Sequence, residues 1–482
     1  MQMKEETNNA GTSPKEGGIW GIIDRIQGDK VIWIILSILI LFSIVSIFSS
    51  TTLLANEHRG TSRVDIFIDQ LKIVLTGIIV IFVCYKIPYI KLFRILSKYG
   101  FAVSLVLLTC LVLDIRAVEA NEAKRSLDLW VFDVHVYEVT KVAMIMYLAW
   151  AVHAFGNDSF RMVGRIAEKI PKLAFLEKPG WKLWIYIYIP ILTVCVLIFA
   201  GSASSALFIG GIMVLTILAG GIKFREILKL LPLMAAALAV CIFIWAVSGG
   251  KTFKRVGTAL SRTGLTEIVE NVTGRPVVSV KSYNDRTILE LDPDSEEFNK
   301  AVDAIRQPES AKIAIHEGGI FGKGPGGSTQ KYTVALIFSD YMYSFIVEEY
   351  GLWGGILIII LYISLLARAT IIVKCCDNVF AKTAVAGLSM LITGQALMHI
   401  YINLDMGLLT GQTLPLISHG KSSFLCFCVA FGIILSISKM TRAKIQKATE
   451  KAKPIGMEPD PDDPQAGLQD LEDFESGKII QQ

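Results

Sequence analysis

The chain has 482 residues, of which 53% are hydrophobic and only 19% are charged. A soluble protein of this length needs more polar surface than that, so the composition predicts a membrane protein. The net charge of +4 is too small to indicate nucleic acid as a partner.

Apolar segments follow one another along the chain, and most approach the roughly 20 residues that a helix needs to cross a bilayer. The pattern predicts an all-α polytopic membrane protein with about ten transmembrane helices and one large extracytoplasmic loop between helices 7 and 8. The predicted spans are residues 31–49, 66–87, 100–117, 137–154, 183–200, 203–221, 230–247, 352–373, 382–404 and 421–438.

Lys and Arg gather in the even-numbered loops and after the last span, so the positive-inside rule predicts that both termini face the cytoplasm. The acidic, proline-containing C-terminal tail is typical of a disordered segment, serving either solubility or docking. The predicted parts are an N-terminal tail (1–30), helices 1 to 7 (31–247), the large loop (248–339), an interfacial helix with helices 8 to 10 (340–438) and a C-terminal tail (439–482).

Two charged residues stand at the start of the fourth predicted span. Glu138 and Lys141 are three residues apart, which places them on one face of a helix. Charges at membrane depth are costly and are usually paired or functional. The pair is therefore either part of a site or a structural ion pair that lets the helix begin there. Arg125, thirteen residues before Glu138, could reach the same place.

The large loop carries Arg255 and Arg262 near its start and the glycine-rich run GGIFGKGPGG (318–327) near its end. The run is not a nucleotide-binding loop, because Lys323 is followed by glycine and not by Ser or Thr. Glycine amides with one lysine could still cradle a diphosphate. The alternative is a flexible turn beside the membrane.

Asp340 begins the segment SDYMYSFIVEEYG (339–351). The apolar run Tyr341–Val347 is too short to span a bilayer and predicts an interfacial or re-entrant helix. Asp340 is then either an ordinary residue at a helix N-terminus or a general base at the boundary between water and lipid. Further on, TGQTLPLISHGKSSF (410–424) joins the last two spans, and its serines are either capping groups or part of a site.

Four blocks together resemble the SEDS family of bacterial membrane proteins, which includes RodA and FtsW. AIHEGGIFGKGPGGSTQK (314–331), SDYMYSFIVEEYG (339–351) and TLPLISHGKSS (413–423) are similar to three motifs of the family, in the same order. A fainter block, KRSLDLWVFDVHVYEVTK (124–141), resembles a fourth. The resemblance extends over the membrane part, from about residue 31 to 438.

The resemblance implies a function that the residue patterns alone do not give. Members of the family polymerise lipid II, an undecaprenyl-diphosphate disaccharide-pentapeptide, into the glycan strands of peptidoglycan. They act in the bacterial cytoplasmic (inner) membrane with a class B penicillin-binding protein and other membrane proteins of the division machinery. The glycosyl transfer inverts the anomeric carbon, so it needs one general base and a stabilised leaving group.

Block matching places the essential aspartate of the family at Asp340, the expected base, and its conserved Glu and Lys at Glu138 and Lys141. Lys323 and the two loop arginines are candidates to neutralise the diphosphate, and the participation of a divalent cation, Mg2+ or Mn2+, is left open. The residues expected to bind substrate are Arg125, Glu138, Lys141, Arg255, Arg262, Gly322, Lys323, Gln330, Ser418 and Ser422.

Some positions depart from the family pattern. His135–Val136 stands where the family usually has Gln-Pro, and Ser202–Ala206 lacks the acid of a Pro-Asp-x-Gly motif. His419 and Lys421 replace the common Tyr and Gly. These departures leave the fine shape of the site open.

The phrase QTLPLIS (412–418) favours the FtsW-like division branch over a RodA-like elongation polymerase. A lipid II flippase is a second alternative, although its spans would carry ionisable residues through their depth. A non-catalytic scaffold of the division machinery is a third. The partner transpeptidase and the role of the 263–312 insert are left open.

Overall fold

The computed structural model describes most of the membrane part of the chain. The described residues are 27–51, 63–120, 123–128, 133–160, 164, 171–230, 232–236, 239–240, 295–334, 337–406 and 411–452. The predicted seventh span, 230–247, lies mostly outside them, as does the first half of the large loop, 248–294.

Eight apolar helical segments in the described part are long enough to cross a bilayer. They are α2 (Lys30–Ser50), α4 (Arg63–Lys86), α5 (Ile90–Val112), α6 (Val136–Gly156), the segment Pro179–Phe199, α17 (Met342–Cys375), α18 (Val379–Asn403) and the first two thirds of α19 (Lys421–Ala452). The shorter apolar helix α10 (Ala203–Ala219) corresponds to the sixth predicted span. The prediction of a polytopic helical membrane protein is confirmed.

Shorter elements complete the described part. The segment Pro179–Phe199 consists of α8 (Pro179–Leu183), a π-helical turn (Trp184–Tyr188) and α9 (Ile189–Phe199), with a 3-10 helix (Pro171–Glu177) before it. The remaining helices are α11 (Phe224–Leu228), α16 (Glu296–Gly318) and a 3-10 turn (Gln330–Tyr332). The strands are β1 (Ala117–Ala120), β2 (Ala123–Asp128) and β3 (Asp133–His135).

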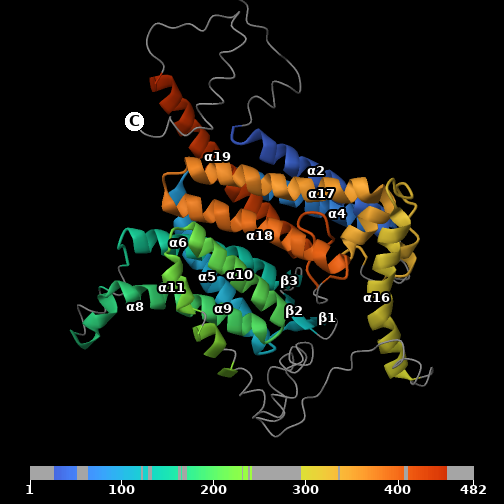
Figure 1. The fold of residues 1–482 in the computed structure, drawn as a ribbon, viewed down its shortest axis with the longest axis horizontal. Coiled ribbons are helices and arrows are strands. Elements are labelled where there is room, and N and C mark those ends of the chain that lie inside the picture. Colours follow the sequence, from blue (N-terminus) through green and yellow to red (C-terminus); the bar gives the residue numbers. More distant parts are fainter. Residues whose placement is uncertain are drawn as a thin grey trace, which may run out of the picture.

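The spans form two neighbouring groups, visible in Figure 1. In one group, α4 packs on α19, and α17 packs on α18 and α2. In the other, α5 packs on α6, and α10 packs on α9 and α6. Helix α18 also contacts α6 and α10, so it joins the two groups. The ends of the bundle differ, because α16 and the small sheet lie towards one end while α8 lies at the other.

The core lies around three helices. In the apolar 18-residue stretch of each spanning helix, the share of buried residues is 67% for α6, 67% for α18 and 72% for α19, against 22% for α4 and for α5. The apolar side chains of the outer helices remain exposed, as expected for surfaces that face lipid. Most polar side chains in the middle of these three helices are therefore shielded from both water and lipid.

The third predicted span, 100–117, is wrong at both ends. Helix α5 begins ten residues earlier, at Ile90, and ends at Val112. Arg94 and Lys98, which the hydropathy pattern assigns to a loop, lie on the first turns of this helix and face α6. The Arg94 guanidinium contacts His153 Nε2 at 2.6 Å, and the Lys98 ammonium lies 4.8 Å from the centre of the Trp150 ring. These partners let charged residues continue the helix.

A small antiparallel sheet in order β1-β2-β3 follows α5, and the sequence pattern did not predict it. The strands precede α6 directly, and the His135 N–H at the end of β3 donates to Ser422 Oγ on α19, at 2.9 Å. This contact holds the sheet to the end of the bundle at which α19 begins.

Helix α17 contains a break that separates a short first part from the span. Gly351 has φ 70° and ψ −173°, which is not helical. The first part, residues 342–350, follows Asp340 closely, and the longer part begins at Leu352. The predicted short helix before the eighth span is therefore present, and Gly351 is the residue that ends it.

Candidate functional site

Asp340 is half-buried and lies one residue before the N-cap of α17. The Ser339 hydroxyl donates to Asp340 Oδ1 at 3.0 Å. The residues around it, 337–341, form turns and not regular helix. The direction of the Asp340 carboxylate therefore depends on what holds this irregular main chain.

Three consecutive carbonyl groups in this turn accept hydrogen bonds from other parts of the chain. Phe338 O accepts from the His419 N–H at 2.9 Å. Ser339 O accepts from the Ser418 hydroxyl at 2.7 Å, and Asp340 O accepts from Asn403 Nδ2 at 3.0 Å. The structure thus brings Ser418, one of the expected site residues, next to Asp340, and Asn403 is a neighbour that sequence reasoning missed.

His419 contributes its backbone to this turn while its ring points elsewhere. Its Nδ1 contacts Gln70 Oε1 at 3.0 Å, on α4. Burial and the nearby Lys421 ammonium lower the pKa of His419, although Asp69 opposes this. The imidazole is therefore neutral at pH 7, so the histidine adds no charge beside Asp340.

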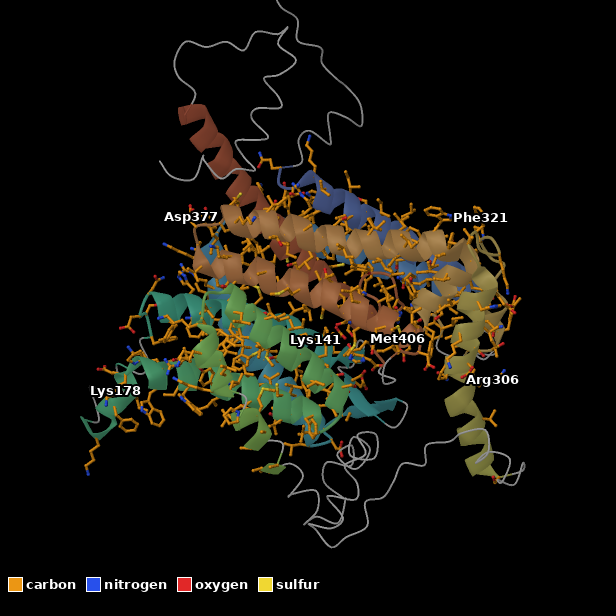
Figure 2. All side chains as sticks on the ribbon, viewed as in Figure 1. Lys141, Lys178, Arg306, Phe321, Asp377 and Met406 are labelled. Atoms are coloured by element: carbon orange, nitrogen blue, oxygen red, sulfur yellow. The ribbon has the colours of Figure 1, made fainter. Side chains whose placement is uncertain are left out.

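Glu138 and Lys141 form a buried ion pair at 2.8 Å on α6. The Lys141 ammonium also donates to Gln395 Oε1 at 2.8 Å and to Gln412 Oε1 at 2.9 Å. An ammonium has three N–H groups, and these three acceptors match them. Lys141 is only 1% exposed, and Figure 2 shows it inside the bundle. The pair holds α6, α18 and the loop before α19 together.

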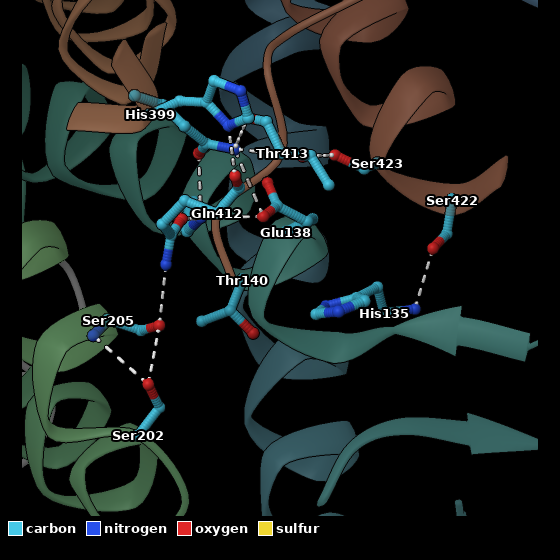
Figure 3. Close-up of polar contacts among 12 residues, drawn as sticks. His135, Glu138, Thr140, Ser202, Ser205, His399, Gln412, Thr413, Ser422 and Ser423 are labelled. Atoms are coloured by element: carbon cyan, nitrogen blue, oxygen red, sulfur yellow. Dashed lines mark hydrogen bonds and ion pairs between the residues drawn. The ribbon is translucent and has the colours of Figure 1, made fainter. Parts of the chain in front are cut away.

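The network continues from Gln412 in two directions (Figure 3). Gln412 Nε2 donates to Ser205 Oγ at 2.9 Å, and Ser202 Oγ donates to the same oxygen at 2.9 Å. The main-chain carbonyl of Gln412 lies 2.7 Å from His399 Nδ1. The segment 202–206, which lacks the acid of the family pattern, thus supplies two serines to this network at the start of α10.

Gln395, His399 and Asn403 are not among the expected site residues, although one signal could have found all three. They recur every four residues along α18, so they share one face of an otherwise apolar helix. Gln412 carried no such signal, because it lies in an irregular loop.

The glycine-rich run is held against the end of the short first part of α17. Lys323 N–H donates to Glu348 O, Gly324 N–H to Glu349 O and Leu352 N–H to Gly319 O, each at 2.9 Å. These bonds run between main chains, so the loop and the end of the helix form one unit.

Gly322 and Gly351 lie directly against one another in this unit. A Cβ on Gly322 would come within 2.3 Å of Glu349 O, and a Cβ on Gly351 would come within 2.3 Å of Ile320 O. Both also have positive φ, which disfavours other residues. Close main-chain packing therefore explains these two glycines without a ligand.

The Lys323 ammonium is engaged by carboxylates of its own surroundings. It pairs with Glu317 and with Glu348, the latter at 3.0 Å, and it donates to Thr329 Oγ1 at 2.8 Å. Partial burial lowers the pKa of Lys323, but the hydrogen bonds to Glu317 and Glu348 outweigh this and raise it. The same contact with Lys323 lowers the pKa of Glu317. Both groups are charged at pH 7.

Glu348 is fully buried and collects donors from the loop. Ser328 Oγ donates to its Oε2 at 2.5 Å, and the Thr329 and Gln330 N–H groups donate to its Oε1 at 2.8 and 3.3 Å. A helix rises about 1.5 Å per residue, so Glu348 lies about 9 Å along the axis from Met342. Lys323 and Gln330 therefore gather at one end of the short helix and Asp340 at the other.

The expected site residues thus fall into three groups in the described part: Asp340 with Ser418, Glu138 with Lys141, and Gly322 with Lys323 and Gln330. Ser422 contacts the end of β3. Arg125 lies on β2, where its side chain is not described, and Arg255 and Arg262 lie outside the described residues. No group of three or more His, Cys, Asp or Glu side chains in the described part could hold a metal ion.

Comparison with known proteins gives consistent matches over the whole membrane part. The profile of the FtsW/RodA/SpoVE family, described as cell cycle proteins, matches residues 29–443. The probable peptidoglycan glycosyltransferase FtsW of Enterococcus hirae is 28% identical over 435 residues, covering 88% of this chain and 96% of that one. The protein of the same name from Coxiella burnetii is 24% identical over 414 residues, covering 85% and 96%.

A solved structure shares the fold. It belongs to work on the structural coordination of polymerization and crosslinking by a peptidoglycan synthase complex. The TM-score is 0.55 and the sequence identity 17%, with 86% of this chain and 98% of that chain covered. At this identity the likeness extends to the arrangement of the helices and not to the chemistry of the site.

Proposed function

Because the chain belongs to the FtsW/RodA/SpoVE family of cell cycle proteins, we propose that it is an FtsW-like peptidoglycan glycosyltransferase. It polymerises lipid II into glycan strands during cell division. The single observation that carries the assignment of the site is the held turn at Asp340, where three consecutive carbonyls are fixed by donors from α18 and the 411–420 loop. Such fixing is what a positioned catalytic group requires.

In the proposed reaction, a sugar 4-hydroxyl oxygen attacks the anomeric carbon of a lipid-linked saccharide. The new carbon–oxygen bond forms as the bond to the undecaprenyl diphosphate breaks, and the diphosphate leaves as an anion. The hydroxyl proton passes to the Asp340 carboxylate, which acts as the general base. A half-buried carboxylate at the start of a short helix suits this task, because the lipid part of the substrate can stay in the bilayer.

Neutralisation of the leaving diphosphate needs positive charge on the opposite side of the anomeric carbon from Asp340, because the reaction inverts that carbon. Lys141 is buried and paired, and Lys323 already contacts two carboxylates. Lys323 can serve only if the diphosphate displaces one of them. We therefore assign this task to Arg125, Arg255 and Arg262, or to a divalent cation, Mg2+ or Mn2+, carried by the diphosphate.

The proposal includes the setting of the enzyme. The protein is a multi-pass protein of the bacterial cytoplasmic membrane, with both termini in the cytoplasm and the large loop outside. Its partner is a class B penicillin-binding protein that cross-links the peptides, together with other membrane proteins of the division machinery. The fold shared with a chain of a peptidoglycan synthase complex supports such an assembly.

The experiment is a glycan-strand assay with purified protein and lipid II, with and without a co-expressed class B penicillin-binding protein. Asp340→Asn keeps the shape of the side chain but cannot take a proton, so the rate should fall by about 10²–10⁴. Asp405→Asn is the matched control: this acid follows α18, is exposed and pairs with Lys312 at 2.6 Å. It should polymerise at nearly the parent rate.

Two results would contradict the proposal. If the parent protein formed no glycan strands with any class B partner, the activity would be wrong. If Asp340→Asn polymerised lipid II as fast as the parent, the activity would stand but Asp340 would not be the base.

A further inference from the structure

The short helix that follows Asp340 has no cap of its own. The side chain of its N-cap residue, Tyr341, makes no capping hydrogen bond. The first N–H groups of a helix have no partner within the helix and need acceptors from elsewhere. Met342, Tyr343 and Ser344 are buried, so water does not reach these groups and another part of the chain must supply the acceptors.

Helix α18 supplies them. The Tyr343 N–H donates to His399 Nε2 at 3.3 Å, and the Ser344 N–H donates to Asn403 Oδ1 at 3.1 Å. These are the second and third helical positions, which a normal N-cap side chain serves. The Ser344 hydroxyl also donates to Asn403 Oδ1, at 2.9 Å. Two side chains one turn apart on α18 thus replace the missing cap.

Asn403 acts on both sides of the start of the helix. While its Oδ1 accepts from Ser344, its Nδ2 donates to Asp340 O at 3.0 Å and to His399 O at 2.9 Å. The side chain is 1% exposed, so these partners are not exchanged with water. Only an amide both accepts and donates in this way. A carboxylate would keep the acceptor and lose the donor, and an alanine would lose both.

His399 links this cap to the buried ion pair. Because Nε2 accepts from Tyr343, the ring proton resides on Nδ1, which donates to Gln412 O at 2.7 Å. The side chain of Gln412 in turn accepts from Lys141. A continuous hydrogen-bonded path therefore runs from the Glu138–Lys141 pair to the helix that starts beside Asp340.

We propose that Asn403 and His399 are positioning residues for Asp340. Both cap, from α18, the short helix that follows Asp340, and Asn403 also fixes the main-chain carbonyl of Asp340. This inference rests on the proposed role of Asp340 as general base and deepens it. Both side chains are 1% exposed, so they act by setting the place and direction of the Asp340 carboxylate. A misplacement of about 1 Å in a catalytic group can cost about 10² in rate.

The test compares Asn403→Ala with Asn378→Ala. Asn378 caps the beginning of α18 itself, through Phe380 N–H at 3.0 Å and Ala381 N–H at 3.4 Å. Both variants thus remove an asparagine that caps a helix, but only Asn403 contacts Asp340. We expect kcat to fall about tenfold or more in Asn403→Ala, with KM for lipid II changed less than about twofold. Asn378→Ala should keep the parent kcat.

A second variant, Asn403→Asp, should change the pH dependence of the polymerisation rate, which a loss of stability alone would leave unchanged. The side chain keeps its size and its acceptor for Ser344 but turns its second oxygen toward two carbonyls, so thermal unfolding in detergent first establishes that the variant folds. It also places a negative charge beside Asp340, and a like charge raises the pKa of a carboxyl group. The acid limb of the pH–rate profile should therefore move to higher pH, while Asn378→Asp, which adds the same charge at the other end of α18, should leave it in place.

Amide hydrogen exchange provides a measurement that does not depend on activity. The Tyr343 and Ser344 amides should exchange faster in Asn403→Ala than in the parent or in Asn378→Ala. If the parent and Asp340→Asn polymerised equally well, the proposed base would fail while this exchange result could still hold. If Asp340 proved essential but Asn403→Ala kept the parent kcat and Asn403→Asp kept the parent pH profile, the positioning role would be overturned.

Discussion

Asp340 shows at the residue scale how burial and partner geometry decide the role of a charged group. It is half-buried at the start of a helix, whereas Glu138 and Lys141 are buried and satisfied by one another and by two glutamine side chains. A base must be reachable by substrate, so the structure favours Asp340 for that role. The Glu138–Lys141 pair has the contacts of a group that holds helices in place, which was one of the two readings its sequence spacing left open.

This pair gives a prediction about stability. Lys141→Met leaves the buried Glu138 carboxylate without an opposite charge, and Glu138→Gln leaves the buried Lys141 ammonium without one. Removing one member of a buried ion pair typically costs about 3–5 kcal/mol. The double variant leaves no unpaired buried charge, so it should be more stable than either single variant. Thermal unfolding in detergent measures this, and single variants as stable as the parent would refute it.

At the element scale, the break in α17 organises the site. The short part of the helix is held at its start by α18, through His399 and Asn403, and at its end by the glycine-rich loop, through Gly322 and Gly351. Because both ends are fixed, the helix is a rigid mount for Asp340. The glycine-rich run therefore has a structural explanation in the packing of main chains.

The glycine contacts can be tested with two matched substitutions. Gly322 and Gly324 both have positive φ, at 78° and 87°, so alanine at either costs about 1–2 kcal/mol in the left-handed region. A Cβ at 324 meets nothing within 4 Å, whereas a Cβ at 322 comes within 2.3 Å of Glu349 O. Gly322→Ala should therefore lower the melting temperature and polymerase rate clearly more than Gly324→Ala. Equal effects would show that the contact with α17 is unimportant.

At the scale of the whole molecule, the ion pairs at the ends of the described spans serve packing and capping. Glu138 pairs with Lys141 within α6, and Arg368 of α17 pairs with Asp29 at 2.6 Å at the opposite end from the glycine-rich loop. Asp29 also accepts from the first N–H groups of α2. A transporter would need ionisable groups that face a route across the membrane, and these pairs instead serve packing and capping.

The arrangement predicts how the protein behaves in proteoliposomes that contain lipid II. We expect glycan strands to form from lipid II in the leaflet that Asp340 faces, without faster exchange of lipid II between leaflets. A fluorescent lipid II quenched from outside reports the exchange, and Asp340→Asn proteoliposomes are the control for polymerisation. Rapid exchange that persists in Asp340→Asn would favour the flippase alternative.

The sequence predicted the features that depend on neighbouring residues. Hydropathy located most of the spans, the i, i+3 spacing placed Glu138 beside Lys141, and the short run after Asp340 gave a separate helical segment. Hydropathy failed at α5, where Arg94 and Lys98 look like loop residues until their partners on α6 are known.

What the sequence by itself determined is the membrane character, the approximate spans and, through four motif blocks, the family. Only the tertiary structure decided what surrounds Asp340. Asn403 lies 63 residues from it and Ser418 lies 79 residues from the Ser339 carbonyl that it holds. Such contacts depend on how helices pack and rotate against one another, and no local pattern of hydropathy or spacing contains that information.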